Sequence, residues 1–202
     1  MSIGGTAAYG SERDLPDLVV RAVALAQRLD FEFSCVPAQG RLLQLLAHGR
    51  PGGVIGETGT GCGVGLAWMA SAADASTRLV SVEVDPDRAE AASELFAGVP
   101  NVTVVVGPWK GIGDYGPFDL LVLDGGGTGK AAEVDPERAD PTGLLKSGGT
   151  VVIDDFSPCD SWPPRVGGRI DEPRLHWLEH PGLRACEIRL SPTLSTIVAT
   201  RR

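Results

Sequence analysis

Apolar and polar positions follow two different periods along this chain. Near the N-terminal end, apolar residues recur every three or four positions, which predicts a helix over residues 15–30 and a second helix that begins at Pro37. From residue 54 onward, short continuous apolar runs alternate with further helical segments. The expected strands are residues 54–57, 79–84, 102–106, 118–123 and 150–154, and the expected helices between them include residues 63–72 and 86–96.

The continuity of the apolar runs indicates how the strands are arranged. Runs without alternation are typical of parallel strands that are buried on both faces. The tail differs, because residues 185–190 alternate and residues 196–200 follow after a Ser-Pro turn, which predicts an antiparallel hairpin. We therefore predict a Rossmann-like doubly wound α/β fold with a mostly parallel seven-stranded sheet and an antiparallel C-terminal hairpin strand. Residues 1–13 are expected to form a flexible arm, and residues 14–202 a single domain.

Length and charge narrow the class of protein. The chain has 202 residues, enough for one domain with a sizeable core, and its net charge of −8 disfavours a nucleic-acid partner. It has no apolar run of about 18 residues and no signal-peptide pattern, so we expect a cytoplasmic protein without a membrane partner. The four cysteines are widely scattered, which predicts reduced thiols and no zinc site.

The first candidate for chemistry is a glycine-rich turn between an expected strand and an expected helix. It reads Glu57-Thr58-Gly59-Thr60-Gly61-Cys62-Gly63, and the spacing of its glycines does not match the dinucleotide fingerprint G-x-G-x-x-G. Glycines allow a backbone to approach a ligand closely. Glu57 can bind a cationic amine, and Glu83, which ends the next strand, can accept both hydroxyls of a ribose. These features predict a ligand with an amino-acid tail and a ribose, and S-adenosylmethionine has both.

A second glycine-rich segment, residues 125–130, resembles a phosphate loop only superficially. The pattern G-x-x-x-x-G-K-[ST] requires glycine where Asp124 stands and serine or threonine where Ala131 stands. The sequence therefore gives no support for a nucleotide-phosphate site there.

Taken together, the motifs resemble those of the class I S-adenosylmethionine-dependent methyltransferases, and most closely the small O-methyltransferases of the catechol and caffeoyl-CoA type. The resemblance runs from about Phe33 to Thr200. The segments that carry it are Val36-Pro37-Ala38-Gln39-Gly40, Glu57-Thr58-Gly59-Thr60-Gly61, Val82-Glu83-Val84-Asp85-Pro86, Leu121-Val122-Leu123-Asp124 and Val152-Ile153-Asp154-Asp155. It implies S-adenosylmethionine as cofactor and O-methylation of a small molecule as activity.

The resemblance also implies a set of cofactor-binding residues. Glu57, Gly59 and Gly63 would line the methionine part, with Cys35 near its amino-acid end. Glu83 would bind the ribose, and the adenine edge would be lined by Gly107, Pro108 and Trp109. Val84 and Asp124 complete the set of cofactor-binding residues.

In the family that the chain resembles, acids after the fourth and fifth strands bind a divalent metal, and here those positions are Asp124, Asp154 and Asp155. Carboxylates suit Mg²⁺ or another hard divalent ion. However, the family's Asp-Asn pair is Asp-Asp in this chain, and adjacent strand residues point to opposite faces unless the chain bends. The family's basic residue has no clear match, since Lys130 lies six residues beyond Asp124. Two readings stay open, a shared metal or catalysis by Asp124 and Asp154 with an aspartate as base.

The acceptor side is expected in the loop over residues 156–168, because open α/β sheets carry active-site loops after their strands. Phe156 and Trp162 are candidates for an apolar wall against a substrate ring, and Arg165 is a candidate partner for a substrate carboxylate.

Three functions remain after these steps. The first is O-methylation of a small molecule, the second is modification of tRNA, and the third is a non-catalytic S-adenosylmethionine-binding dimeric protein. The acidic balance disfavours the second, and the unmatched basic residue keeps the third open. The first helix has no sheet partner in the predicted pattern, and related proteins use this region at a two-fold interface, so we expect a homodimer.

Overall fold

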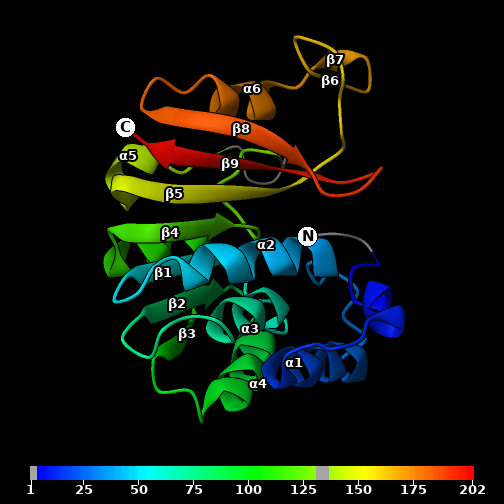
Figure 1. Ribbon diagram of the computed structural model, residues 1–202, viewed down its shortest axis with the longest axis vertical. Coiled ribbons are helices and arrows are strands. Elements are labelled where there is room, and N and C mark those ends of the chain that lie inside the picture. Colours follow the sequence, from blue (N-terminus) through cyan, green and yellow to red (C-terminus); the bar gives the residue numbers. More distant parts are fainter. Residues whose placement is uncertain (1–3, 131–136) are drawn as a thin grey trace.

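The sheet has the strand order β3-β2-β1-β4-β5-β9-β8, with helices packed against it (Figure 1). This computed structural model describes residues 4–130 and 137–202. Parallel pairing joins β3 through β5, and β9 is antiparallel to both of its neighbours. The predicted fold class, including the antiparallel C-terminal hairpin, is confirmed.

The element bounds lie close to those that the apolar pattern predicts. The strands of the sheet are β1 (Val54–Thr58), β2 (Arg78–Glu83), β3 (Val102–Val106), β4 (Phe118–Leu123), β5 (Leu145–Phe156), β8 (Leu183–Arg189) and β9 (Ser195–Arg201). The α-helices are α1 (Asp17–Arg28), α2 (Pro37–His48), α3 (Val64–Ala70), α4 (Pro86–Phe96), α5 (Pro141–Leu144) and α6 (Glu172–Leu178). Two 3-10 helices, η1 (Ala7–Ser11) and η2 (Trp109–Tyr115), complete the described elements together with a short ribbon.

The central strands contribute to two hydrophobic cores. In β4, Leu120 and Val122 pack into the core that contains α1, α2 and α3, whereas Leu121 and Leu123 join the core that contains Ile112 and Trp177. Successive side chains of a strand point to opposite faces, so these strands are buried on both sides. This burial is the physical reason for the continuous apolar runs.

The strand order reverses between β1 and β4. In open parallel sheets, ligands bind in the crevice beyond the carboxyl ends of the strands at such a switch point. Glu57 belongs to β1, and Asp124 directly follows β4. The two acids that the sequence singles out therefore flank the expected ligand position.

The described part of the N-terminal segment, which the sequence predicts to be a flexible arm, makes contacts with the rest of the domain. Tyr9 in η1 is buried, and its hydroxyl accepts a hydrogen bond from the Trp68 indole at 2.9 Å. The same hydroxyl donates to the carbonyl of Cys35 at 2.9 Å, and Thr6 donates to the carbonyl of Phe31 at 2.6 Å. Single side chains, rather than a periodic apolar face, hold this segment in place. For that reason its packing could not be predicted from the pattern of apolar residues.

The loop after β5 is also more regular than expected. It leads into a two-stranded antiparallel ribbon of β6 (Arg165–Val166) and β7 (Arg169–Ile170), which Figure 1 shows projecting beyond the end of β8. Strands of two residues are too short to carry a recognisable alternation. No helix among the described residues is long and apolar enough to cross a membrane.

Candidate functional site

The glycine turn after β1 adopts conformations that few other residues tolerate. Gly59, Gly61 and Gly63 have φ angles of 85°, 53° and 81°. A β-carbon on Gly59 would lie 2.4 Å from the Cα atom of Gly125, so this turn touches the turn that follows β4. The glycines are thus needed both for left-handed backbone angles and for close approach.

Glu57 is the buried acid at the start of this turn. One of its carboxylate oxygens accepts a hydrogen bond from the Ser81 hydroxyl at 2.6 Å, and its side chain is 3% exposed. Burial raises the pKa of Glu57 to about 8, and the charges of Asp124 and Glu83 act in the same direction. The salt bridges of the described residues include none to Glu57. A cationic ligand group beside this carboxylate would therefore stabilise its charged form.

A small cavity opens next to Glu57. It is lined by Cys35 and Asp124 together with the glycine turn, and by the aromatic pair Phe31 and Phe33. Gly65 in α3 also lines it, and a β-carbon there would lie 2.6 Å from a carboxylate oxygen of Glu57. Gly65 is a residue whose role the sequence did not reveal.

Glu83, at the end of β2, borders a second cavity of about 280 Å³. Its carboxylate accepts hydrogen bonds from the backbone amides of Gly61 at 2.7 Å and Asp85 at 3.0 Å, and it pairs with Arg88 at 2.9 Å. These donors fix the carboxylate at the rim of the cavity. The residues predicted for the ribose and adenine that line this cavity are Glu83, Val84, Gly107 and Trp109.

Two of the predicted cofactor residues lie differently. Pro108 precedes η2 and lines none of the described cavities. Gly63 is the N-cap residue just before α3, and a β-carbon there would lie 2.8 Å from the Phe96 ring, which belongs to the hydrophobic core.

Phe31 and Phe33 are the cavity residues that sequence reasoning missed. Both line the cavity at Glu83 and the small cavity at Glu57, and their rings meet edge to face with centroids 5.7 Å apart. The Arg88 guanidinium lies 5.5 Å from the centre of the Phe31 ring. The sequence does show two aromatic residues just before Ser34-Cys35. It does not show whether such a pair lines a cavity or packs in the hydrophobic core.

The three aspartates do converge. Asp124, Asp154 and Asp155 place carboxylate oxygens within 4.8 Å of one another. Asp155 has a φ of 58°, and the pairing of β5 with β9 shifts register between Ile153 and Phe156. Adjacent residues of a regular strand point to opposite faces, but the chain bends here, and so Asp154 and Asp155 can direct their carboxylates to the same place.

Crowding and burial perturb this acid cluster. Burial raises the pKa of Asp154 to about 7, with further contributions from the charges of Asp124 and Asp155. Burial likewise raises the pKa of Asp124. Like charges at this separation favour protonation unless a cation joins them.

Lys130 supplies a cation at the same place. Its ammonium group donates to the backbone carbonyl of Asp154 and, at 3.4 Å, to that of Asp155, and it lies 4.9 Å from the centre of the Phe156 ring. The intervening turn contains Gly127 and Gly129 at φ angles of 76° and 73°, which return the chain toward β5. Burial lowers the pKa of Lys130, and the three aspartates oppose that shift. Lys130 is therefore a candidate for the family's basic residue, for which the sequence gave no clear match.

Two larger cavities share Asp155, Phe156 and Ser157 as a common wall. The first, of about 580 Å³, continues toward η1, the start of α2 and the turn before β9. The second, of about 540 Å³, continues toward Lys130 and the β6–β7 ribbon, and Arg165 lines it. Trp162 lines neither cavity and is 66% exposed, so it does not form the wall expected with Phe156.

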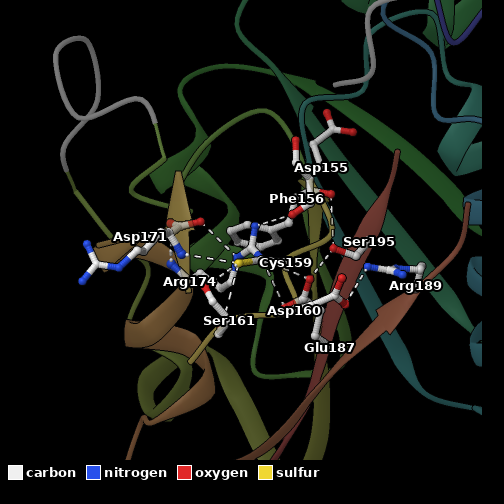
Figure 2. A network of polar contacts seen from close by, with 12 residues as sticks. Asp155, Phe156, Cys159, Asp160, Ser161, Asp171, Arg174, Glu187, Arg189 and Ser195 are labelled. Atoms are coloured by element: carbon white, nitrogen blue, oxygen red, sulfur yellow. Dashed lines mark hydrogen bonds and ion pairs between the residues drawn. The ribbon is translucent and has the colours of Figure 1, made fainter. Parts of the chain in front are cut away.

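A network around Arg174 positions this common wall. The buried Arg174 guanidinium pairs with Asp171 at 3.0 Å and Glu187 at 3.2 Å, and it donates to the carbonyl of Ser157 at 2.6 Å (Figure 2). It also lies 5.0 Å from the centre of the Phe156 ring. Arg174 thereby ties the end of β5 to α6 and β8.

Comparison with known proteins agrees with this geometry. Residues 57–156 match a family model described as a methyltransferase domain. A protein of Mycobacteroides abscessus assigned as an O-methyltransferase is 30% identical in an alignment of 158 positions that covers 73% of this chain and 66% of that protein, slightly less than two thirds. A protein of Mycobacterium tuberculosis with the same assignment is 27% identical over 91% of this chain and 83% of its own length. The crystal structure of the O-methyltransferase from Bacillus cereus in complex with S-adenosylhomocysteine has a TM-score of 0.71 and 20% identity, covering 98% of this chain and 96% of that one.

The fold, the glycine turn and the acids at the switch point define a class I methyltransferase. The matched family model is described as a methyltransferase domain, and the two mycobacterial relatives and the solved structure carry O-methyltransferase names.

Proposed function

We propose that this chain binds S-adenosylmethionine across the glycine turn and transfers its methyl group to an oxygen atom of a small molecule. The observation that carries the proposal is the pair of buried carboxylates, Glu57 and Glu83, on either side of a turn whose three glycines have left-handed backbone angles. Glu57 would bind the cationic amine of the methionine part, and Glu83 the ribose hydroxyls. Val84, Gly107 and Trp109 would surround the nucleoside, because they line the cavity at Glu83.

The chemical step requires alignment more than activation. The acceptor oxygen attacks the methyl carbon, the carbon–sulfur bond breaks, and the sulfonium becomes the neutral thioether of S-adenosylhomocysteine. Holding the oxygen in line with that bond contributes most of the acceleration. The cavities that meet at Asp155 and Phe156 would hold the acceptor beside the acid cluster.

The acceptor also loses a proton, and the acid cluster is the group that we propose receives it, through Asp124 or Asp154. The donor set of Asp124, Asp154 and Asp155 fits a hard divalent cation such as Mg²⁺, because it offers carboxylate oxygens within 4.8 Å of one another. When bound, such an ion would polarise the acceptor oxygen. The Lys130 ammonium would stabilise negative charge on that oxygen and hold the acceptor against Phe156.

Cofactor binding is tested with S-adenosylhomocysteine. We expect micromolar affinity, about −8 kcal/mol, and an increase in melting temperature. Glu83→Ala is expected to weaken binding by roughly 1–3 kcal/mol, because hydrogen bonds to a charged group are lost. Asp87→Ala, in the first turn of α4 but outside the cavities described above, is the matched control. The absence of any thermal shift at millimolar ligand would refute the proposal, and a larger shift with NAD would point to a dehydrogenase.

We also propose a cytoplasmic homodimer as the working form. The four cysteines are free thiols, which suits a reducing compartment. Val20 and Leu29, on and just after α1, are large apolar side chains that are about half exposed, which suits a helix covered by a second chain. Light scattering at micromolar concentration is expected to give the mass of two chains, and the mass of one chain would overturn the dimer.

A further inference from the structure

Residues 31–35, which we call the aromatic wall, border both cavities that we assign to the cofactor. Phe31 and Phe33 line both of these cavities, and Ser34 and Cys35 line the smaller one. The aromatic wall belongs to neither a helix nor a strand. Its backbone groups therefore have no regular ladder of hydrogen bonds, and its path depends on contacts with other parts of the chain.

Thr6 makes three of these contacts. Its hydroxyl donates to the carbonyl of Phe31 at 2.6 Å and lies 2.7 Å from the hydroxyl of Ser34. Because the one hydroxyl proton of Thr6 is used at Phe31, Ser34 donates the second hydrogen bond. The backbone amide of Thr6 also donates to the carbonyl of Glu32 at 3.3 Å. Thr6 thereby holds most of the length of the aromatic wall.

Tyr9 holds the end of the wall that leads into α2. Its hydroxyl donates to the carbonyl of Cys35 at 2.9 Å and accepts from the Trp68 indole at 2.9 Å. Trp68 is itself fixed in place, because Gly40 of α2 packs directly against its indole ring. Thr6, Tyr9 and Trp68 are all buried, so water does not replace these hydrogen bonds readily.

A displacement of the aromatic wall would change the cofactor cavities directly. A β-carbon on Gly61 would lie 2.9 Å from the Phe31 ring, so this ring packs against the glycine turn. The Arg88 guanidinium lies 5.5 Å from the centre of the same ring and pairs with Glu83 at 2.9 Å. The position of Phe31 is therefore linked both to the turn and to the acid proposed for the ribose.

From these contacts we infer that Thr6 and Tyr9 are positioning residues for the cofactor, which hold the aromatic wall where its side chains enclose S-adenosylmethionine. Neither residue lines a described cavity, so both act through the wall and not by touching the ligand. Both also lie outside residues 57–156, the part that matches the family model. The inference rests on the proposed function. A wall that is already in place does not have to be ordered when the ligand binds.

The test removes one hydroxyl at a time and measures the affinity for S-adenosylhomocysteine by calorimetry. Thr6→Val keeps the shape of the side chain and loses the donor to Phe31. We expect its affinity to fall about fivefold, because binding must then also order the wall. Thr6→Ser keeps the hydroxyl and should bind as the wild type does. Tyr9→Phe removes the other attachment and should also weaken binding about fivefold.

Thr77→Val is the matched control. Thr77 is another fully buried threonine whose hydroxyl donates to a backbone carbonyl, that of Arg50 at 2.8 Å. It directly precedes β2, at the opposite end of that strand from Glu83, and it lines none of the described cavities. Thr77→Val should lower the free energy of unfolding as Thr6→Val does, measured by urea denaturation, but its affinity for S-adenosylhomocysteine should not change.

Wild-type affinity in Thr6→Val or in Tyr9→Phe would overturn the inference. An equal loss in Thr77→Val would also overturn it, because the loss would then follow stability alone, and so would an equal loss in Thr6→Ser. If Thr6→Val does not fold, the comparison of Tyr9→Phe with Thr77→Val decides the question. The thermal shift of the wild type with S-adenosylhomocysteine separates the two proposals. If that shift is absent, the proposed function fails and the inference fails with it, whereas a shift with unaffected variants overturns the inference alone.

Discussion

The carboxylate of Glu57 and the hydroxyl of Ser81 are joined by a hydrogen bond of 2.6 Å between neighbouring strands. Among the described residues, this neutral donor is the one hydrogen-bond partner of a carboxylate that is almost completely buried. A hydroxyl stabilises a negative charge less than a cation does, and so burial dominates and raises the pKa of Glu57 to about 8. The unliganded protein thus holds this acid largely neutral at pH 7, in a position where a ligand amine would make it ionise.

The affinity for S-adenosylhomocysteine is therefore expected to depend on pH. Below about pH 8 the amine must displace a proton from Glu57, so affinity should rise with pH by up to about tenfold per unit and level off near pH 8. Calorimetry in two buffers of different ionisation enthalpy should detect release of a proton at pH 6.5, a value about halfway up this rise. In Glu57→Gln the affinity should be lower, and this release should be lost. Proton release that persists in the variant would assign it to another group.

The same pKa shift affects the stability of the unliganded protein with a defined sign. The folded state binds a proton at Glu57 that the unfolded state releases above the ordinary pKa of 4.5. The free energy of unfolding should then decrease as the pH rises from 4.5 to about 8, and Glu57→Gln should flatten that decrease. Urea denaturation at several pH values measures both slopes.

Gly65→Ala tests the position of Glu57 without removing its charge. A β-carbon at this position would lie 2.6 Å from a carboxylate oxygen of Glu57, so the carboxylate has to move. We expect at least a tenfold loss of affinity for S-adenosylhomocysteine, with a small change in stability because alanine favours the helix by about 1 kcal/mol. Gly98→Ala is the control, since nothing lies within 4 Å of a β-carbon there. Wild-type affinity in Gly65→Ala would show that Glu57 does not contact the ligand.

The fold was predictable because burial on both faces of the sheet leaves continuous apolar runs, as in β4 and β5. The positions of Glu57, Glu83 and Asp124 followed from the same pattern, since each lies at or just beyond a strand end. These are properties of single elements and their order along the chain. Contacts between a loop and a distant part of the chain depend on the path of the loop through space, and the sequence did not reveal them.

Lys130 illustrates that limit. Its spacing from Asp124 is too long for the family pattern, yet the turns at Gly127 and Gly129 bring its ammonium group to the carbonyl of Asp154. The place of Phe31 and Phe33 beside the cavities was not predicted for a related reason. An aromatic pair that lines a cavity and one that packs in a core can have the same local sequence. The packed segment at Tyr9 depends on one hydroxyl and one indole rather than on a periodic pattern.

The acid cluster provides the last prediction, because a shared metal and an aspartate base lead to different measurements. Asp155 adopts a φ of 58°, in the left-handed region that few non-glycine residues other than Asn and Asp enter. That bend directs two adjacent carboxylates and Asp124 to within 4.8 Å of one another. Burial and the neighbouring charges raise the pKa of Asp154 to about 7, so the cluster is under repulsion that a divalent ion would relieve.

We therefore expect Mg²⁺ to bind to the protein saturated with S-adenosylhomocysteine, with heat and proton release on calorimetric titration. Asp124→Asn should weaken this binding, because a charged ligand atom is replaced by a neutral one, and methyl transfer should fall with EDTA and return with Mg²⁺. Heat of equal size in both proteins would locate the ion elsewhere. If neither protein gives heat and EDTA leaves activity unchanged, the ion has no part in the reaction. The carboxylates would then act without a metal, and Asp154→Asn should lower the rate of methyl transfer at every Mg²⁺ concentration, because the acceptor proton would lose its base.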